Sequence, residues 1–126
     1  MTLAKLIVSA LLACSAAATY AMEVKPYSVA ALDAAQKTDK PVALHFRADW
    51  CPTCRAQDKV LESLKSEPGL ALIVLAVNYD TEKDLKRRFG VNAQSTLVVL
   101  KGKKETSRLV GETSRQTLLT ALKSPL

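Results

Sequence analysis

The sequence predicts an α/β protein whose central mixed sheet has about four strands, with helices on both faces. Three observations predict it. Apolar runs of strand length alternate with segments whose apolar residues recur at helical spacing. Two of these runs are joined through a helical segment, which favours parallel strands and a right-handed crossover. The last two runs are separated only by a short basic turn, residues 101–104, which favours an antiparallel hairpin.

The elements are expected in the order helix, strand, helix, strand, helix, strand, strand and helix, after a short segment with the length of an edge strand. That segment spans residues 23–27, and the elements that follow it span 28–37, 41–46, 52 to the break at 67–69, 70–77, 81–89, 96–100, 105–110, and a closing helix from 113. Two strands, 41–46 and 70–77, are almost wholly apolar, as in strands buried on both faces. The strand 105–110 is more polar, as an edge strand is.

Each expected helix has a capping residue or an apolar face. Ser28 can cap the first helix and Thr81 the third, while residues 113–116 have the pattern of a capping box. Pro52 suits the first turn of the second helix, and Gly90 the end of the third. The expected buried faces are Val29, Ala30, Leu32, Ala34 and Ala35; Ala56, Val60, Leu61 and Leu64; and Leu118, Leu119, Ala121 and Leu122.

Residues 1–21 differ from the rest of the chain. Lys5 precedes a short apolar stretch over residues 6–13, and small residues lead to Thr19-Tyr20-Ala21. This order is typical of a secretory signal peptide, and the stretch is shorter than the ~20 residues of a membrane-spanning helix. We therefore expect an exported protein with one domain over residues 22–126.

A second interpretation of the same segment stays open. Leu11-Leu12-Ala13-Cys14 resembles a bacterial lipobox, in which Cys14 would carry the lipid. Only in that case would the protein be held at a membrane. Under either interpretation Cys14 lies outside the core of the domain.

Residues 22–126 hold 17 Lys and Arg against 12 Asp and Glu, a formal net charge of +5. The positive side chains gather in two clusters, Lys86, Arg87 and Arg88, and Lys101, Lys103 and Lys104. These clusters could attract acidic partners or a membrane surface, but we favour the interpretation that they are a solvated helix face and a charged turn. No aromatic residues interleave with them, so we expect no nucleic-acid binding. We also expect a monomer.

Cys51 and Cys54 are the only cysteines of residues 22–126. A bridge across two residues closes a very small loop and stabilises little, so the pair suits reaction better than structure. Cys51 directly precedes a predicted helix, whose positive end favours a thiolate over a thiol. Because the thiolate is the form that attacks disulfides, the pair indicates thiol–disulfide exchange.

The stretch Ala48-Asp49-Trp50-Cys51-x-x-Cys54 resembles the active-site stretch of the thioredoxin family. Asn78-x-Asp80, Gly90-Val91 and Gly111 also fall where that family places them, and the resemblance covers residues 28–124. Together with the N-terminal segment, the chain is similar to exported bacterial thioredoxin-like proteins. The resemblance implies the thioredoxin fold and a periplasmic thiol–disulfide oxidoreductase.

The resemblance further implies that Cys51 is an exposed nucleophile that forms a mixed disulfide with a protein substrate. Cys54, one helical turn further and more buried, would resolve it. The partners would be protein dithiols or disulfides and a redox partner protein. No cofactor is expected, because the sequence has no Gly-rich phosphate loop. The residues expected to meet the substrate are Trp50, Pro52, Thr53, Gln94, Ser95 and Thr96.

His45, the only histidine, stands six residues before Cys51, where the family commonly has a buried Asp that moves protons to and from the resolving thiol. On a strand, Leu44 and Phe46 point to the opposite face. A buried imidazole, with an ordinary pKa of ~6.5, could take over as the base or could be a hydrogen-bonded core residue. Ala76 stands where the family often has a lysine, so that charge pair is missing.

Ser95 stands where the family has a cis-proline facing the cysteines. A cis bond before a non-proline residue costs ~3 kcal/mol or more, so the Gln94–Ser95 bond is expected to be either trans in a reshaped loop or cis and strained. The Ser95 hydroxyl could donate a hydrogen bond to a sulfur. Between the cysteines, Pro52-Thr53 replaces the family's Gly-Pro, which helps to set the redox potential.

Two other functions stay open. Cys51, Cys54 and His45 could hold soft Cu(I), and loss of the proline eases access, so a periplasmic metal carrier is the second hypothesis. A structural zinc site is not expected, because residues 22–126 hold only three Cys and His and such sites need four ligands. The third hypothesis is a non-catalytic binding module with a thioredoxin fold.

Overall fold

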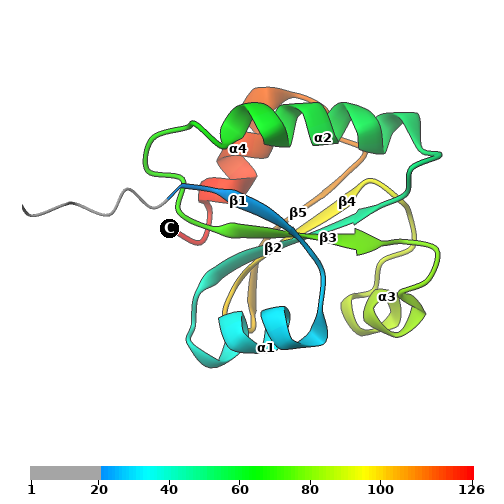
Figure 1. The fold of residues 1–126 in the computed structure, drawn as a ribbon, viewed down its shortest axis with the longest axis horizontal. Coiled ribbons are helices and arrows are strands. Elements are labelled where there is room, and N and C mark those ends of the chain that lie inside the picture. Colours follow the sequence, from blue (N-terminus) through cyan, green and yellow to red (C-terminus); the bar gives the residue numbers. More distant parts are fainter. Residues whose placement is uncertain (1–20) are drawn as a thin grey trace, which may run out of the picture.

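Five strands form one mixed sheet in the computed structural model, which describes residues 21–126 (Figure 1). Across the sheet they follow the order β1-β3-β2-β4-β5, and their bounds are β1 Glu23–Pro26, β2 Pro41–Arg47, β3 Ile73–Asn78, β4 Thr96–Lys101 and β5 Lys104–Val110. The α/β class with a mixed sheet is confirmed. The predicted signal peptide, apart from Ala21, and the possible lipid site at Cys14 lie outside the described residues.

The strand pairing agrees with the sequence prediction except at the N-terminal edge. β2 runs parallel to β3, and β4 is antiparallel to both β2 and β5, so the parallel pair and the antiparallel hairpin are confirmed. The sheet has five strands rather than about four, because β1 pairs in parallel with β3. β1 is short and mostly exposed, so its pairing with β3, and not an apolar pattern, makes it a strand.

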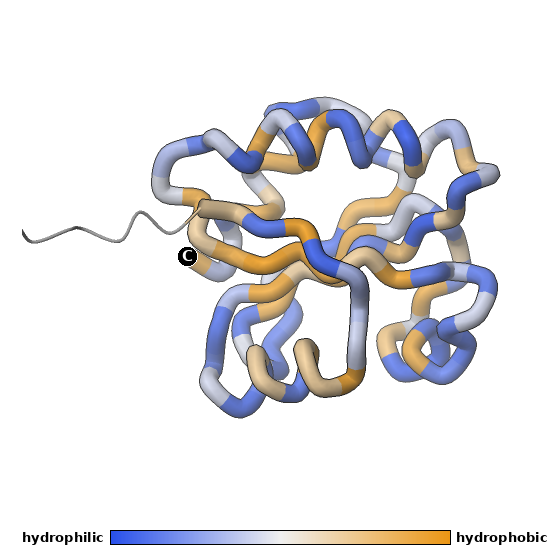
Figure 2. The backbone as a smooth tube through the Cα atoms, in the orientation of Figure 1, coloured by the Kyte–Doolittle hydropathy of each residue, from blue (hydrophilic) through white to orange (hydrophobic). Residues whose placement is uncertain are grey.

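Four helices cover the two faces of the sheet: α1 Val29–Lys37, α2 Pro52–Leu64, α3 Lys83–Phe89 and α4 Arg115–Lys123. Figure 1 shows α2 and α4 on one face and α1 and α3 on the other. Along the backbone the central strands are mostly apolar, whereas the helices alternate between polar and apolar residues (Figure 2). Among residues 21–126, none of the helices combines the length and the apolar character that a membrane crossing requires.

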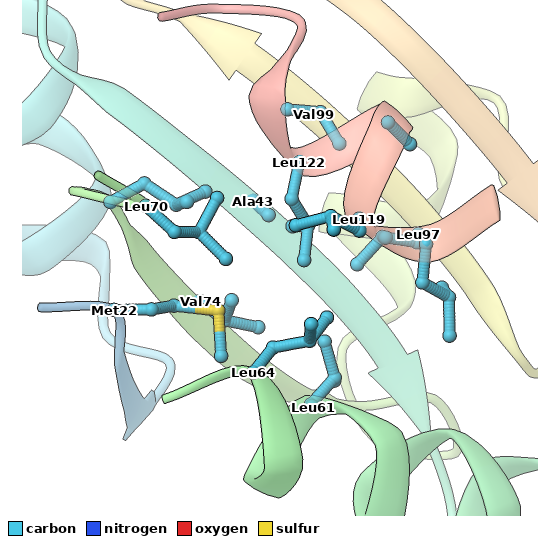
Figure 3. Packing of buried hydrophobic residues seen from close by; sticks show 13 residues of the cluster. Met22, Ala43, Leu61, Leu64, Leu70, Val74, Leu97, Val99, Leu119 and Leu122 are labelled. Carbon is cyan, nitrogen blue, oxygen red and sulfur yellow. The ribbon is translucent and has the colours of Figure 1, made fainter. Parts of the chain in front are cut away.

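Alternation along the strands divides the core between the two faces. On one face, Leu61 and Leu64 of α2 and Leu119 and Leu122 of α4 pack against Ala43, Val74, Leu97 and Val99 of the sheet (Figure 3). On the other face, α1 and α3 pack against Val42, Leu44, Phe46, Leu75, Val77, Val98 and Leu100. Because β2 is buried on both faces, it holds the residues that precede the cysteines in a fixed place.

The predicted helix ends are correct at some helices and wrong at others. Ser28 caps α1 by accepting the Ala31 N–H at 3.1 Å, and Gly90 ends α3 with a φ of 62°, both as predicted. Thr81 is not the cap of α3, which begins two residues later without a side-chain cap. Instead, Asn78 Oδ1 closes that turn by accepting the N–H of Thr81 and of the residue before it. The cap of α4 is Ser114, one residue after the predicted start.

The buried helix faces also differ from the predicted ones. The α4 face is confirmed in full: Leu118, Leu119, Ala121 and Leu122 are buried. On α1 only Leu32 and Ala35 are buried, because the helix contacts the sheet along a narrow stripe; Val29, Ala30 and Ala34 are exposed. On α2 the buried stripe is Cys54, Gln57, Leu61 and Leu64, while Ala56 and Val60 are half-buried.

Candidate active site

The C-terminal ends of β2 and β3 lie at the same edge of the sheet as the first turn of α2 (Figure 1). Cys51 caps α2 in an extended backbone conformation (φ −92°, ψ 110°), and its Sγ accepts the Cys54 N–H at 3.1 Å. Pro52 occupies the first turn, where a helix does not need a backbone N–H, as predicted. Cys51 Sγ therefore lies at the positive end of α2, where negative charge on sulfur is stabilised.

Cys51 and Cys54 are joined by a disulfide, with their Cα atoms 5.2 Å apart. Both residues are buried, at 2% and 0% exposed, in a cluster with Ala48. The expectation that Cys51 is exposed is therefore wrong for this oxidised form. Ala48 packs against it, and so does Ser95, in the loop that directly precedes β4 (the Ser95 loop). The cysteines differ in place instead: Cys51 stands before the helix, and Cys54 lies in its first turn.

The Ser95 hydroxyl oxygen lies 3.2 Å from Cys51 Sγ and 3.1 Å from Cys54 Sγ. Of the two expected geometries, the structure has the trans bond, since none of the peptide bonds of residues 21–126 is cis. Ser95 has a φ of +64°, which is uncommon for a residue with a side chain. Its N–H donates to Phe46 O at 2.9 Å, and its carbonyl accepts the Gly111 N–H at 3.0 Å. The reshaped loop thus places a hydroxyl against both sulfurs.

His45 is buried below the cysteines' helix, on the face of β2 opposite Leu44 and Phe46, as predicted. Its strand partner on β3 is Ala76. Its Nε2 lies 2.8 Å from Gln57 Oε1 on α2. The predicted buried imidazole is confirmed, and its role as a base stays a prediction.

Gln57 fixes which nitrogen of His45 carries the proton. The Gln57 side-chain nitrogen donates to Ser95 O at 3.1 Å and to Glu112 O at 2.8 Å, two groups that can only accept. Its Oε1 must therefore face His45, and since Oε1 only accepts, the His45 Nε2 must donate. The proton that the ring carries points at Gln57.

The charges around His45 act on its pKa in both directions. Burial lowers the pKa of His45 below its ordinary value of 6.5, while the hydrogen bond with Gln57 and the carboxylate of Asp58 oppose that effect. The Asp58 Oδ1 lies 3.6 Å from His45 Nδ1, and the positive charge of Arg47 lowers the pKa further. Burial is the largest of these effects, so the net lowering of the pKa favours the neutral ring.

Arg47 and Asp58 form a paired charge at the end of β2. Arg47 Nε contacts both carboxylate oxygens of Asp58, at 3.1 and 3.0 Å, and Nη1 contacts Asp49 at 2.9 Å. Burial works against the charge of Arg47, but the hydrogen bonds that Arg47 donates to Asp49 and Asp58 raise its pKa above the ordinary value. The ion pair connects the end of β2, just before the segment that leads to Cys51, with α2.

The remaining predicted substrate-binding residues surround the disulfide in different ways. Trp50 is 57% exposed, and its Nε1 donates to Asp80 Oδ2 at 2.8 Å, so the ring is held at the surface beside the cysteines. Pro52 is exposed, and Thr53 and Gln94 are half-buried. Thr96 is buried and its hydroxyl donates to Ala93 O, so its side chain faces its own loop rather than a substrate.

Sequence reasoning did not select Gln57, Arg47 or Asp58. One signal could have found Gln57, because it lies at helical spacing between Cys54 and Leu61 on the buried stripe of α2. A polar residue on such a stripe needs partners inside the protein. Arg47 is two residues after His45, and residues two apart on a strand point to the same side, so the two share a face of β2.

A metal site does not form from these residues in the described state. Cys51 and Cys54 are bonded to each other, and the ring nitrogens of His45 face Gln57 and Asp58. Within residues 21–126, no three His, Cys, Asp or Glu side chains lie together in a way that could hold a metal ion. The disulfide form therefore offers no ligand set for the metal-carrier hypothesis.

The sequence model of the thioredoxin family matches residues 23–124, nearly the whole described chain. The chain belongs to the thioredoxin family. The thioredoxin fold and the thioredoxin-type CxxC pair predicted from the sequence are confirmed.

Curated thioredoxins match over most of this chain. The thioredoxin of Mycobacterium tuberculosis H37Rv is 32% identical over 103 residues, which cover 78% of this chain and 89% of the relative. The bifunctional thioredoxin reductase/thioredoxin of Mycobacterium leprae is 33% identical over 82 residues, which cover 65% of this chain. Those residues span only 18% of that longer protein.

Solved structures agree with this assignment. The crystal structure of Trxlp from Edwardsiella tarda EIB202 is 40% identical, with a TM-score of 0.73, and the match covers 80% of this chain and 97% of that one. A thioredoxin of Malassezia sympodialis shares the fold at 22% identity, with a TM-score of 0.69 and coverage of 84% and 95%. This protein is a thioredoxin-type thiol–disulfide oxidoreductase, of a family that acts on protein disulfides with redox partners.

Proposed function

We propose that the protein is a periplasmic, monomeric thiol–disulfide oxidoreductase in which Cys51 attacks the substrate and Cys54 resolves the mixed disulfide. The observation that carries the assignment of roles is the setting of Cys51 Sγ. It caps α2 and accepts the Cys54 N–H at 3.1 Å, and the Ser95 hydroxyl lies 3.2 Å away. These donors and the positive helix end stabilise a thiolate at Cys51 once the disulfide is reduced.

The reaction proceeds by two exchanges. In the reduced protein, the Cys51 thiolate attacks one sulfur of a substrate disulfide; a bond forms to that sulfur, the substrate S–S bond breaks, and the other substrate sulfur leaves as a thiolate. Cys54 then loses its proton and attacks Cys51 Sγ, which releases the second substrate thiolate. Two electrons have passed to the substrate, and the Cys51–Cys54 disulfide has formed. A redox partner protein must return two electrons for the next cycle.

The Trp50 ring, next to Cys51 in the sequence, is exposed and held by Asp80. Gln94 is half-buried and directly precedes Ser95, whose hydroxyl lies against both sulfurs. Thr53 is half-buried and Pro52 is exposed, so both offer contacts beside Cys51. We assign these four residues to substrate binding. For Thr96 only the backbone is available, because its hydroxyl is bound within the loop.

The test is reduction of insulin disulfides with dithiothreitol as the electron source, using the protein without residues 1–21. The wild type should accelerate precipitation of insulin, and Cys51→Ser should abolish the acceleration. Cys54→Ser should instead accumulate a mixed disulfide with the substrate, visible on a non-reducing gel. If Cys51→Ser accumulates that adduct and Cys54→Ser does not, the two roles are reversed.

The periplasmic location is supported by the N-terminal order of Lys5, an apolar stretch and small residues up to Ala21. Expression of the full chain in a Gram-negative host should give a periplasmic product that begins at Met22, as determined by mass spectrometry. A product that begins at Cys14 and carries a lipid would establish the alternative anchored form. An uncut product in the cytosol would refute export. Sedimentation of the cut product tests the proposed monomer.

A further inference from the structure

Gln57 is a fully buried amide on the face of α2 that packs against the sheet. Its neighbours on that stripe are Cys54, one turn before it, and Leu61, one turn after it. Burying a polar side chain among apolar ones is unfavourable unless hydrogen bonds compensate. Every polar atom of the Gln57 amide has such a partner.

These partners come from three segments that are far apart in the chain. The amide nitrogen donates to Ser95 O before β4 and to Glu112 O after β5, and the amide oxygen accepts from His45 on β2. One side chain of α2 therefore connects the helix that carries both cysteines to the loop that faces them. His45 holds the opposite end of the same amide.

The Ser95 loop needs such support because its backbone is strained. A φ of +64° costs on the order of 1 kcal/mol for a residue with a Cβ, so the conformation persists only where surrounding contacts impose it. The contacts are the Phe46 carbonyl, the Gly111 N–H and the Gln57 amide. In this conformation the Ser95 hydroxyl lies 3.1 Å from Cys54 Sγ.

We propose that Gln57 is a positioning residue for the disulfide exchange: its amide holds the Ser95 loop so that the Ser95 hydroxyl stays within hydrogen-bonding distance of both sulfurs. The inference rests on the proposed function of Cys51 and Cys54. A hydroxyl donates more strongly to a thiolate than to a neutral disulfide sulfur. Holding Ser95 in place therefore stabilises the reduced form, and loosening it shifts the pair toward the disulfide.

The test is the equilibrium constant of the Cys51–Cys54 pair with glutathione in the wild type and in Gln57→Leu. Leucine keeps the approximate volume and removes all three hydrogen bonds. The constant should shift toward the disulfide by up to about tenfold, equivalent to ~30 mV. The thiolate absorbance should also titrate at higher pH. Leu61→Ala is the matched control: it weakens the packing of the same helix in the apolar cluster, but a leucine side chain makes no hydrogen bond to Ser95, so its constant should equal the wild-type value.

A second comparison tests whether Gln57 acts through Ser95. In the double variant Gln57→Leu/Ser95→Ala, the constant should equal that of Ser95→Ala alone, because the hydroxyl to be positioned is already absent. Additive shifts would overturn the proposal. A Gln57→Leu variant that folds and keeps the wild-type equilibrium constant would also overturn it, since Gln57 would then contribute only to packing.

A third variant covers the case in which Gln57→Leu does not fold. Gln57→Glu keeps an oxygen facing His45 but loses the N–H groups that donate to Ser95 O and Glu112 O. It should therefore show the same shift, and a wild-type constant would overturn the proposal. The glutathione equilibrium needs no protein substrate. Insulin reduction by the wild type, measured in parallel, therefore shows separately whether the proposed function itself fails.

Discussion

The hydroxyl oxygen of Ser95 lies 3.2 Å from the sulfur of Cys51. In most of the thioredoxin family a proline stands at this position, and proline can donate no hydrogen bond. The second donor to Cys51 is the Cys54 N–H, which any residue except proline would supply at that position. Ser95 is therefore the feature that distinguishes the setting of the sulfurs in this chain, and its hydroxyl should influence how readily they ionise.

Ser95→Ala should destabilise the Cys51 thiolate, because the variant loses the hydroxyl near both sulfurs. A hydrogen bond to a charged group contributes roughly 1.5 kcal/mol, so the thiolate absorbance of the reduced protein should titrate about one pH unit higher. Ser63→Ala makes the same change on the exposed face of α2 and should leave the titration as it is. If Ser95→Ala titrates like the wild type, the hydroxyl does not stabilise the thiolate.

The backbone of Ser95 gives a second prediction. Ser95→Gly and Ser95→Ala lose the same hydroxyl, but only glycine adopts a φ of +64° without steric cost. The glycine variant should therefore be more stable than the alanine variant by about 1 kcal/mol. Urea unfolding of the two variants measures this difference. Equal stabilities would mean that the loop relaxes to another conformation once the hydroxyl is gone.

The buried His45 should make folding sensitive to pH. Burial lowers the pKa of His45 in the folded protein, so below its unfolded value of about 6.5 the unfolded chain binds a proton that the folded chain does not. The free energy of unfolding should fall as the pH decreases from ~6.5 toward the folded pKa, by up to ~1.4 kcal/mol per pH unit. Urea unfolding at several pH values measures the slope. His45→Leu should lack this contribution, and an identical slope in both proteins would contradict it.

His45→Ala should also slow the resolution step. Without the ring, the Gln57 oxygen loses its donor, and the amide that contacts the Ser95 carbonyl is held only through its nitrogen. Stopped-flow measurement of the release of a substrate thiol from Cys51 should show a lower rate between about pH 6 and 8. A rate equal to that of the wild type throughout this range would limit His45 to packing.

Much of the fold could be predicted because its signals are local. The apolar runs of β2, β3 and β4 and the short basic turn between β4 and β5 predicted the centre of the sheet and the hairpin. The first turn of α2 was also local, since Cys51 and Pro52 carry its cap and its N-terminal residue. By contrast, β1 became a strand only through pairing with β3, and Val29 is exposed because α1 contacts the sheet along a narrow stripe.

The environment of the cysteines was less predictable because it depends on contacts between distant segments. The sequence showed that Ser95 replaces a proline, but its φ is imposed by Phe46, Gly111 and Gln57, which come from three other parts of the chain. The spacing of Gln57 on α2 could indicate that it is buried, but its partners, His45, Ser95 and Glu112, lie in distant segments and cannot be predicted from it. The role of His45 likewise depends on which atom its proton faces.

The most direct test of the central claim is to alkylate the reduced protein with limiting iodoacetamide across a range of pH and to identify the modified cysteine by mass spectrometry. If Cys51 is the activated nucleophile, it should be modified first, and its rate should stay high well below the ordinary thiol pKa of about 8.5. Cys54, which lies inside the first turn of α2 rather than before the helix, should react slowly. Preferential modification of Cys54, or a Cys51 rate that follows an ordinary thiol, would contradict the account.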